Sequence, residues 1–193
     1  QNAWIVEDDY DGEFRYGQRP MDALQSIDSD GRVIYVGTFS KALSPLLRLG
    51  YLVLPPDLVS VFREAKRLTD RHAPVLEQRV LASLIHSGAY ERHVRRMRRE
   101  NERRRGALLD AVARYLPKDA RVGGSAAGLH VVLWLPSRNP EDEPVLATAA
   151  RQLGVGIYPV SGLFAQPQTC AQARPAGFIL GYASLTGEQI QQG

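Results

Sequence analysis

The chain has 193 residues, 44% of them hydrophobic and 23% charged, and a formal net charge of +3. This is material for one large or two small globular domains. A single cysteine, Cys170, excludes an internal disulfide and agrees with a reducing cytoplasm, where we expect the protein to act. No apolar run approaches the ~20 residues of a transmembrane helix, so we expect no membrane partner.

Three short apolar runs come first, at residues 3–9, 33–38 and 49–54. Runs of this length that are apolar almost throughout are typical of buried, often parallel, strands. Pro55-Pro56 ends the third run, and Asp57 is the predicted N-cap of the helix that follows.

Apolar residues at helical spacing then predict three successive helices. The first reaches the break at His72-Ala73-Pro74. The second covers about 77–86 and stops at Ser87-Gly88, and the third runs over about 89–115.

From about residue 121 the pattern changes to that of a small α+β domain. The expected elements are strands at 129–135, 155–160 and 178–183, a helix at 145–153 closed by Gly154, and a last helix from about Gly187. The polar stretch 165–177 is expected to be a mobile loop.

Lys41 is the most informative residue of the chain. It follows the apolar run 33–36 and stands close to the hydroxyls of Thr38 and Ser40. A partly desolvated lysine loses its proton easily and can form a Schiff base. Taken alone, Lys41 is better interpreted as a lysine that reaches solvent from a strand end.

Asp8 and Arg48 give Lys41 a chemical context. Pyridoxal phosphate needs an amine for its aldehyde, a carboxylate that keeps its pyridine nitrogen protonated, and cations or hydroxyls for its phosphate. Lys41 meets the first need and Asp8 the second. Arg48, with Thr38 and Ser40, meets the third.

Tyr10 strengthens the interpretation of Asp8. Two residues apart on an extended strand, the two side chains would point to the same face, so the tyrosine could donate to the phenolate oxygen of the cofactor ring. Without this spacing Asp8 and Asp9 could be ordinary loop acids. We expect structural roles for Glu7 and Asp9.

Two stretches carry a family resemblance: WIVEDDYDGEFRYGQRPMDALQSID and VIYVGTFSKALSPLLRLGYLVLPPDL. They resemble the aminotransferase-like domain of MocR-type transcriptional regulators of the GntR family, a domain similar to fold-type I pyridoxal-phosphate aminotransferases. The resemblance runs from about residue 3 to the end. It implies the pyridinium contact for Asp8, the phenolate contact for Tyr10, the internal aldimine for Lys41 and a phosphate contact for Arg48.

The resemblance also implies an α/β fold in three parts. Residues 1–88 would be the C-terminal half of a three-layer αβα large domain, 89–116 a long interdomain helix, and 117–193 the small α+β C-terminal domain. In that family a winged helix-turn-helix domain comes first. The first half of the large domain then supplies a phosphate-cradling loop, a stacking aromatic and an asparagine. We therefore expect a cofactor-free fragment of a longer, homodimeric regulator.

One position departs from the aminotransferase pattern. Aminotransferases usually bind the substrate carboxylate with an arginine in the last strand of the small domain, and Ile179 stands about there. Arg174, five residues earlier, is the candidate substitute. The missing arginine favours a domain that senses a cofactor or an unusual amine.

The segment 91–105 holds eight arginines in fifteen residues, which invites a nucleic-acid interpretation. We favour a helix with one buried face and Glu–Arg pairs along its surface. His72, His86 and His93 lack metal-ligand spacing, so no metal is expected.

Three functions remain open. The first is a regulator domain that binds pyridoxal phosphate with an amine or amino-acid effector and acts on DNA through a winged helix outside this chain. The second is an authentic aminotransferase in which Lys41 also moves a proton. The third is a nucleic-acid-binding module built on the arginine-rich helix.

Overall fold

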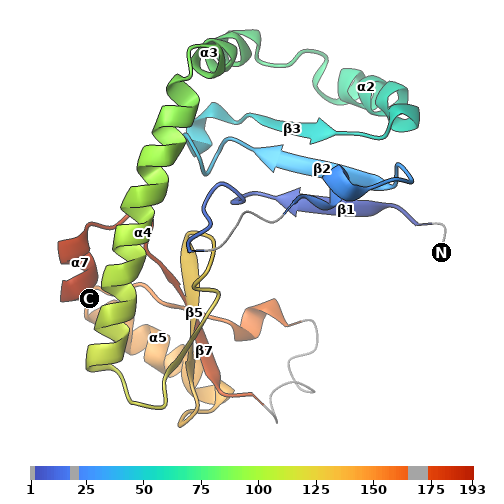
Figure 1. Cartoon of the computed structure of the whole chain (residues 1–193). Helices are drawn as coiled ribbons and strands as arrows, with labels where there is room; N and C mark the ends of the chain where they lie inside the picture. Colours follow the sequence, from blue (N-terminus) through green and yellow to red (C-terminus); the bar gives the residue numbers. More distant parts are fainter. Residues whose placement is uncertain (1–2, 18–21, 165–173) are drawn as a thin grey trace. The chain divides into compact units, whose positions relative to one another are not determined.

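The computed structural model describes residues 3–17, 22–164 and 174–193, which divide into two units (Figure 1). The first unit comprises residues 1–13 and 18–97, and the second comprises 14–17 and 98–193. The division falls inside the long helix α4 (Ala89–Tyr115), so this helix contributes to both units. The predicted domain limits at residues 88 and 116 stay a prediction.

The first unit is built on a three-stranded sheet in the order β1-β2-β3. β1 (Ile5–Asp9) runs parallel to β2 (Val33–Thr38), and β3 (Gly50–Val53) runs antiparallel to β2. The three apolar runs were therefore predicted as strands correctly. Their burial was not: the central strand β2 holds the buried Val33 and Ile34, whereas all of β3 and most of β1 are exposed.

The helices in the described part of the first unit are α1 (Leu24–Ile27), α2 (Pro56–Asp70), α3 (Val75–His86) and the start of α4. A short 3-10 turn, η1 (Pro45–Leu47), precedes β3. The predicted N-cap of α2 was wrong. Pro55 occupies that position and Pro56 begins the helix, because proline lacks the N–H that the first helical turn leaves unused. Asp57 lies in the first turn, where its charge favours the helix dipole.

The second unit is an antiparallel sheet with helices. Its strands lie in the order β4-β5-β7-β6 and are β4 (Arg121–Gly123), β5 (His130–Leu135), β6 (Tyr158–Pro159) and β7 (Ala176–Gly181). Its other elements are the end of α4, η2 (Pro140–Asp142), α5 (Glu143–Gln152), η3 (Ser161–Leu163) and α7 (Gly187–Gln192). The inward alternation of β5 and β7 buries Val131, Leu133 and Phe178.

Residues 14–17 belong to this second unit, although they follow β1 in the chain. The N–H of Tyr16 donates to the carbonyl of Ala126 (2.9 Å), and the N–H of Gly128 donates to the carbonyl of Phe14 (2.7 Å). The hydroxyls of Tyr16 and Tyr182 both donate to the carbonyl of Gly128. Phe14 and Tyr16 are almost fully buried, so this segment is part of the core.

Two expectations for the second unit need correction. The strand expected at 155–160 is only Tyr158–Pro159. The expected loop 165–177 is too long, because β7 already begins at Ala176, and residues 165–173 lie outside the described part. Gly154 follows α5 with a φ of 82°, as predicted for a residue just beyond a helix end.

Within the described residues, no helix is both long enough and apolar enough to cross a membrane.

Candidate cofactor site

The three consecutive acidic residues of β1 differ in the hydrogen bonds that they accept. Glu7 accepts hydrogen bonds from the backbone N–H groups of Leu24 (2.8 Å) and Gln25 (3.1 Å), so its carboxylate lies at the start of α1. Asp9 accepts a hydrogen bond from the Tyr35 hydroxyl (2.8 Å). Asp8, between them, is exposed and forms no hydrogen bond or ion pair with any residue in the described ranges.

Alternation along the strand explains this difference. Successive side chains point to opposite faces, so Glu7 and Asp9 share one face of the sheet and Asp8 points to the other. The structural roles expected for Glu7 and Asp9 have a geometric basis in these bonds. The carboxylate of Asp8 stays available to a ligand.

Thr38 and Ser40 form the turn that carries Lys41. The N–H of Ser40 donates to the Thr38 hydroxyl oxygen (3.2 Å), which lies 3.1 Å from the Ser40 hydroxyl oxygen. The N–H of Leu43 donates to the carbonyl of Phe39 (2.8 Å), so the backbone makes a full turn around Lys41. The carbonyl of the buried Ala42 lies 3.0 Å from His93 Nε2, which holds the turn against α4.

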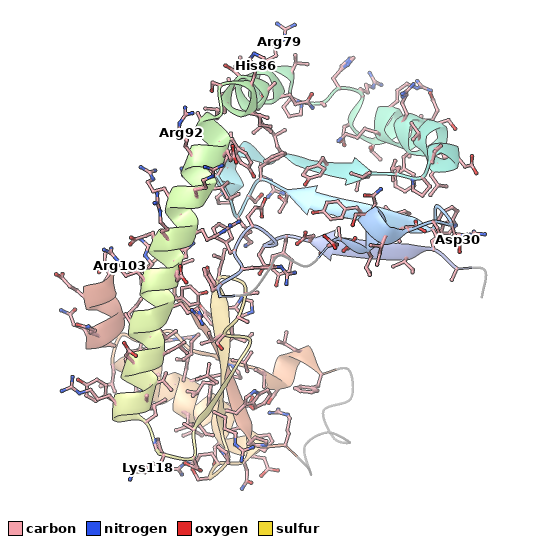
Figure 2. All side chains as sticks on the ribbon, viewed as in Figure 1. Asp30, Arg79, His86, Arg92, Arg103 and Lys118 are labelled. Carbon is pink, nitrogen blue, oxygen red and sulfur yellow. The ribbon has the colours of Figure 1, made fainter. Side chains whose placement is uncertain are left out.

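Lys41 is exposed, although it lies in the chain between two runs that were expected to be buried strands, 33–38 and 49–54. The reason is that β3 is itself exposed and the chain leaves β2 before it reaches the lysine. The chain contains two other lysines, Lys66 and Lys118. Lys66 pairs with Asp70 on α2, and Lys118 lies exposed in the turn after α4 (Figure 2).

Arg48 adopts a left-handed backbone conformation with φ 51° and ψ 34°. This conformation is uncommon for a residue with a Cβ and costs on the order of 1–2 kcal/mol. Ser44 caps η1 by accepting from the N–H of Leu46 (3.3 Å), and the chain must then reverse at Arg48 to enter β3. Strained residues of this kind concentrate at ligand sites. The Arg48 side chain is exposed.

The sheet register brings these residues to one edge. Asp8 is the partner of Val36, and Thr38 is the partner of Gly50. The carboxyl ends of β1 and β2 therefore meet the amino end of β3, which begins two residues after Arg48. In sheets with parallel strands, ligands bind outside these carboxyl ends.

Tyr10 lies one residue beyond β1, in a bend, so the strand alternation used to orient it does not extend that far. Its side chain is exposed. The negative charge of Asp11, with partial burial and the charge of Asp8, raises the pKa of the Tyr10 hydroxyl, which therefore stays protonated and able to donate at neutral pH.

Arg174 is occupied by an internal partner. Its Nη1 donates to Oε1 of Glu143 (2.6 Å) and to the carbonyl of Pro175 (3.0 Å), and its Nη2 donates to the Ser161 hydroxyl (2.7 Å). Its guanidinium also lies over the ring of Phe164, 4.7 Å from the centroid. A ligand carboxylate would have to compete with Glu143 for it.

Glu143 is fully buried and was not anticipated from the sequence. Its carboxylate also accepts from the N–H and hydroxyl of Ser161 and from the N–H of Gly177 (2.9 Å). Burial acts to raise the pKa of Glu143, but the bonds from Arg174, Ser161 and Gly177 outweigh it and hold that pKa below the ordinary value. A glutamate at the start of a helix gives no sequence signal for such burial.

The arginine-rich part of α4 contains the ion pairs expected of a surface helix: Arg95 with Glu91, and both Arg103 and Arg104 with Glu100. The Nη1 of Arg92 donates to the carbonyl of Ser87, just after α3 (3.2 Å; Figure 2). Among the described residues, no cluster of three or more His, Cys, Asp or Glu could hold a metal ion.

Comparison with known proteins shows which family this chain belongs to. The family described as aminotransferase class I and II matches residues 1–169. The chain belongs to this family. Pyridoxal phosphate is the family's cofactor, and the α/β architecture is that of fold-type I aminotransferases, as the resemblance implied.

Two regulators match the chain over its whole length. The HTH-type transcriptional regulator YhdI of Bacillus subtilis is 38% identical, and the probable rhizopine catabolism regulatory protein MocR of Rhizobium meliloti is 39% identical. The chain spans 39% and 38% of their lengths. This aminotransferase family member is thus similar to the aminotransferase-like part of MocR-type regulators, as predicted.

A solved structure gives the same fold. A kynurenine aminotransferase from Pyrococcus horikoshii, in complex with PMP, superposes with a TM-score of 0.86 and is 28% identical. The superposition covers 98% of this chain and 45% of that protein.

Proposed function

We propose that this chain is part of the effector domain of a DNA-binding transcriptional regulator, and that the domain binds pyridoxal phosphate. The observation that carries the proposal is the sheet edge at which neither Asp8 nor Lys41 forms a hydrogen bond or ion pair within the described ranges. The similarity of the whole chain to about two-fifths of two regulatory proteins supports the regulatory role.

Each residue at this edge fits one part of the cofactor. Asp8, which forms no hydrogen bond within the described ranges, would keep the pyridine nitrogen protonated, which makes the bound ring an electron sink. Lys41 would supply the amine that condenses with the aldehyde. The hydroxyls of Thr38 and Ser40 and the guanidinium of Arg48 would bind the phosphate. Tyr10 would donate a hydrogen bond to the ring oxygen.

The effector in this proposal is a small amine or amino acid. It would reach the same lysine-bound cofactor, and its arrival would change the state that the domain transmits to a DNA-binding domain of a homodimer. Ile179 leaves β7 without the usual carboxylate-binding arginine, and Glu143 already engages Arg174. Both features favour an effector whose carboxylate, if it has one, is bound elsewhere.

The alternative is an aminotransferase, supported by the kynurenine aminotransferase that shares the fold at 28% identity. Two measurements on the full-length protein separate the two functions. A regulator should bind its own promoter DNA with an affinity that changes when pyridoxal phosphate and an amine are added. An enzyme should convert an amino acid to its keto acid over many turnovers, and such turnover without DNA binding would refute the regulatory proposal.

Replacing Asp8 with alanine tests the pyridinium role. A charge-assisted hydrogen bond contributes about 1.5–3 kcal/mol, so we expect Asp8→Ala to weaken cofactor binding roughly tenfold or more in the full-length protein. Equilibrium titration followed by absorbance measures this affinity. Asp119→Ala, at an exposed acid of the second unit, is the matched control and should bind like the wild type. Wild-type affinity in Asp8→Ala would refute the assignment.

The 193-residue chain by itself should bind the cofactor weakly and associate with itself. β1 and β3 are the edges of the described three-stranded sheet, and Ile5, Val6, Leu52 and Val53 are exposed there. Exposed apolar edge strands recruit other chains. We expect sedimentation to reveal oligomers and the titration to give an affinity at least about tenfold below that of the full-length protein. A strict monomer with stoichiometric, tightly bound cofactor would contradict this.

A further inference from the structure

Four aromatic side chains form a continuous row in the first unit. Ring centroids of Tyr35 and Tyr51 lie 6.0 Å apart, those of Tyr51 and Phe39 lie 5.4 Å apart, and those of Phe39 and Tyr90 lie 5.8 Å apart. These separations fall in the range of favourable ring contacts. We call these four residues the aromatic row.

Both ends of the aromatic row bind the segment that carries Asp8. At one end the Tyr35 hydroxyl donates to Asp9 Oδ2 (2.8 Å). At the other end the Tyr90 hydroxyl donates to Glu13 Oε1 (3.2 Å). The row thus connects the end of β1 and the residues after it to β2, β3 and α4.

The aromatic row also reaches the turn that carries Lys41. Phe39 lies between Thr38 and Ser40 in the chain, and its ring contacts both Tyr51 and Tyr90. The N–H of Phe39 donates to the carbonyl of Leu49 (3.2 Å), next to Arg48. Through these contacts Phe39 fixes the position of the residues that begin the turn carrying Lys41.

The row meets the sheet on the face opposite Asp8. Asp9 is the partner of Gly37, and Gly37 is the partner of Tyr51, so these three positions share a face. Asp8 points to the other face because it precedes Asp9 by one residue. The aromatic row can therefore pack against the face of the sheet opposite Asp8, where it does not occupy the cofactor site.

Gly37 is required by this arrangement. A Cβ at residue 37 would overlap the Tyr51 ring, closer than any real side-chain contact. Gly12 plays the same part for the carboxylate of Asp9, which a Cβ at residue 12 would also overlap. Burial, together with the hydrogen bond to Asp9, raises the pKa of Tyr35 above its ordinary value, so its hydroxyl stays protonated and able to donate at neutral pH.

We propose that Tyr35 and Tyr51 are positioning residues, which fix Asp8 and Lys41 at the separation that one cofactor ring demands. The inference rests on the proposed function. Asp8 and Lys41 would bind opposite ends of a rigid ring, so an error of a fraction of an ångström at either would weaken one contact. The Asp9–Tyr35 bond sets the end of β1, and the packing of Tyr51 on Gly37 and Phe39 sets the lysine turn.

The test is Tyr35→Phe in the full-length protein, which keeps the ring and removes the bond to Asp9. We expect the cofactor dissociation constant to rise about fivefold. We also expect the pH at which the absorbance of the bound cofactor titrates to move by at least about half a pH unit, because Asp8 is displaced from the ring nitrogen. Tyr158→Phe, at an exposed tyrosine of β6, is the control and should change neither quantity.

A second set of variants tests the packing. Gly37→Ala should produce a similar spectral shift, because it displaces the Tyr51 ring. In Tyr51→Leu the space above residue 37 is already vacated, so adding Gly37→Ala should have little further effect, and the two changes should be non-additive. Additive effects, or an unchanged titration in Tyr35→Phe, would overturn the positioning role. If the cofactor is not on Lys41 at all, the proposed function fails first, and peptide mapping distinguishes that case.

Discussion

Lys41→Ala is expected to abolish covalent attachment of pyridoxal phosphate to the full-length protein and with it the visible absorbance of the bound cofactor. Lys41 is exposed at the carboxyl end of β2, on the turn held by Thr38 and Ser40. An alanine keeps the turn but removes the amine, and no other amine of the first unit lies on that turn. Absorbance spectra of dialysed protein measure the loss.

The two other lysines are natural controls for this prediction. Lys66→Ala and Lys118→Ala remove the same charge from α2 and from the turn after α4, and both should keep the wild-type spectrum. Retention of the cofactor spectrum in Lys41→Ala, with its loss in either control, would contradict the assignment.

Glu143→Ala is expected to have the largest effect on folding. It leaves the Arg174 guanidinium, the Ser161 N–H and hydroxyl and the Gly177 N–H without their acceptor. Breaking a buried, hydrogen-bonded ion pair costs about 3–5 kcal/mol. Denaturant unfolding of the second unit should show this loss. Glu141→Ala, at an exposed acid two residues earlier, should change stability by less than about 0.5 kcal/mol.

The pH dependence of stability gives an independent check on Glu143. Because its folded-state pKa lies below the unfolded value, its contribution is fully present above about pH 4.3 and is lost as the pH falls through the folded-state pKa. Glu143→Ala should therefore lose less stability than the wild type on acidification below that point. Equal acid sensitivity of the two proteins would show that Glu143 is not held ionised by its partners.

The positions of helices and strands could be predicted from the sequence better than the burial of their side chains. Local signals such as Ser87-Gly88 and Gly154 end α3 and α5 where expected, because helix ends depend on nearby backbone conformation. The burial of β1 and β3 was predicted wrongly, since a strand's apolar composition does not say which partner covers it. The chain spans only about two-fifths of the regulators it matches.

The residues of the candidate site could also be predicted from local sequence, whereas their surroundings could not. Asp8, Lys41 and Arg48 could be proposed from residue chemistry and spacing, and the register of β1, β2 and β3 brings their segments to one sheet edge. Glu7 and Asp9 accept hydrogen bonds from α1 and from Tyr35, whereas Asp8 accepts none in the described part of the chain. These bonds join residues that are 17 to 26 positions apart in the chain. Pairings over such distances come from tertiary structure, which no local pattern encodes.

The association of Arg174 with Glu143 is a further example, across 31 residues. An arginine five residues before Ile179 can be noticed in the sequence as a candidate for a ligand carboxylate. That it binds a buried glutamate at the start of α5 depends on the packing of α5, η3 and β7, and it changes what the arginine can offer to an effector.

The most direct test of the central claim is the location of the cofactor. The full-length protein should be loaded with pyridoxal phosphate, reduced with borohydride to make the linkage permanent, digested, and mapped by mass spectrometry. We predict one phosphopyridoxyl group per chain, attached to Lys41. Attachment to Lys66, to Lys118 or to a lysine outside this chain, or the release of all cofactor after reduction, would contradict the account.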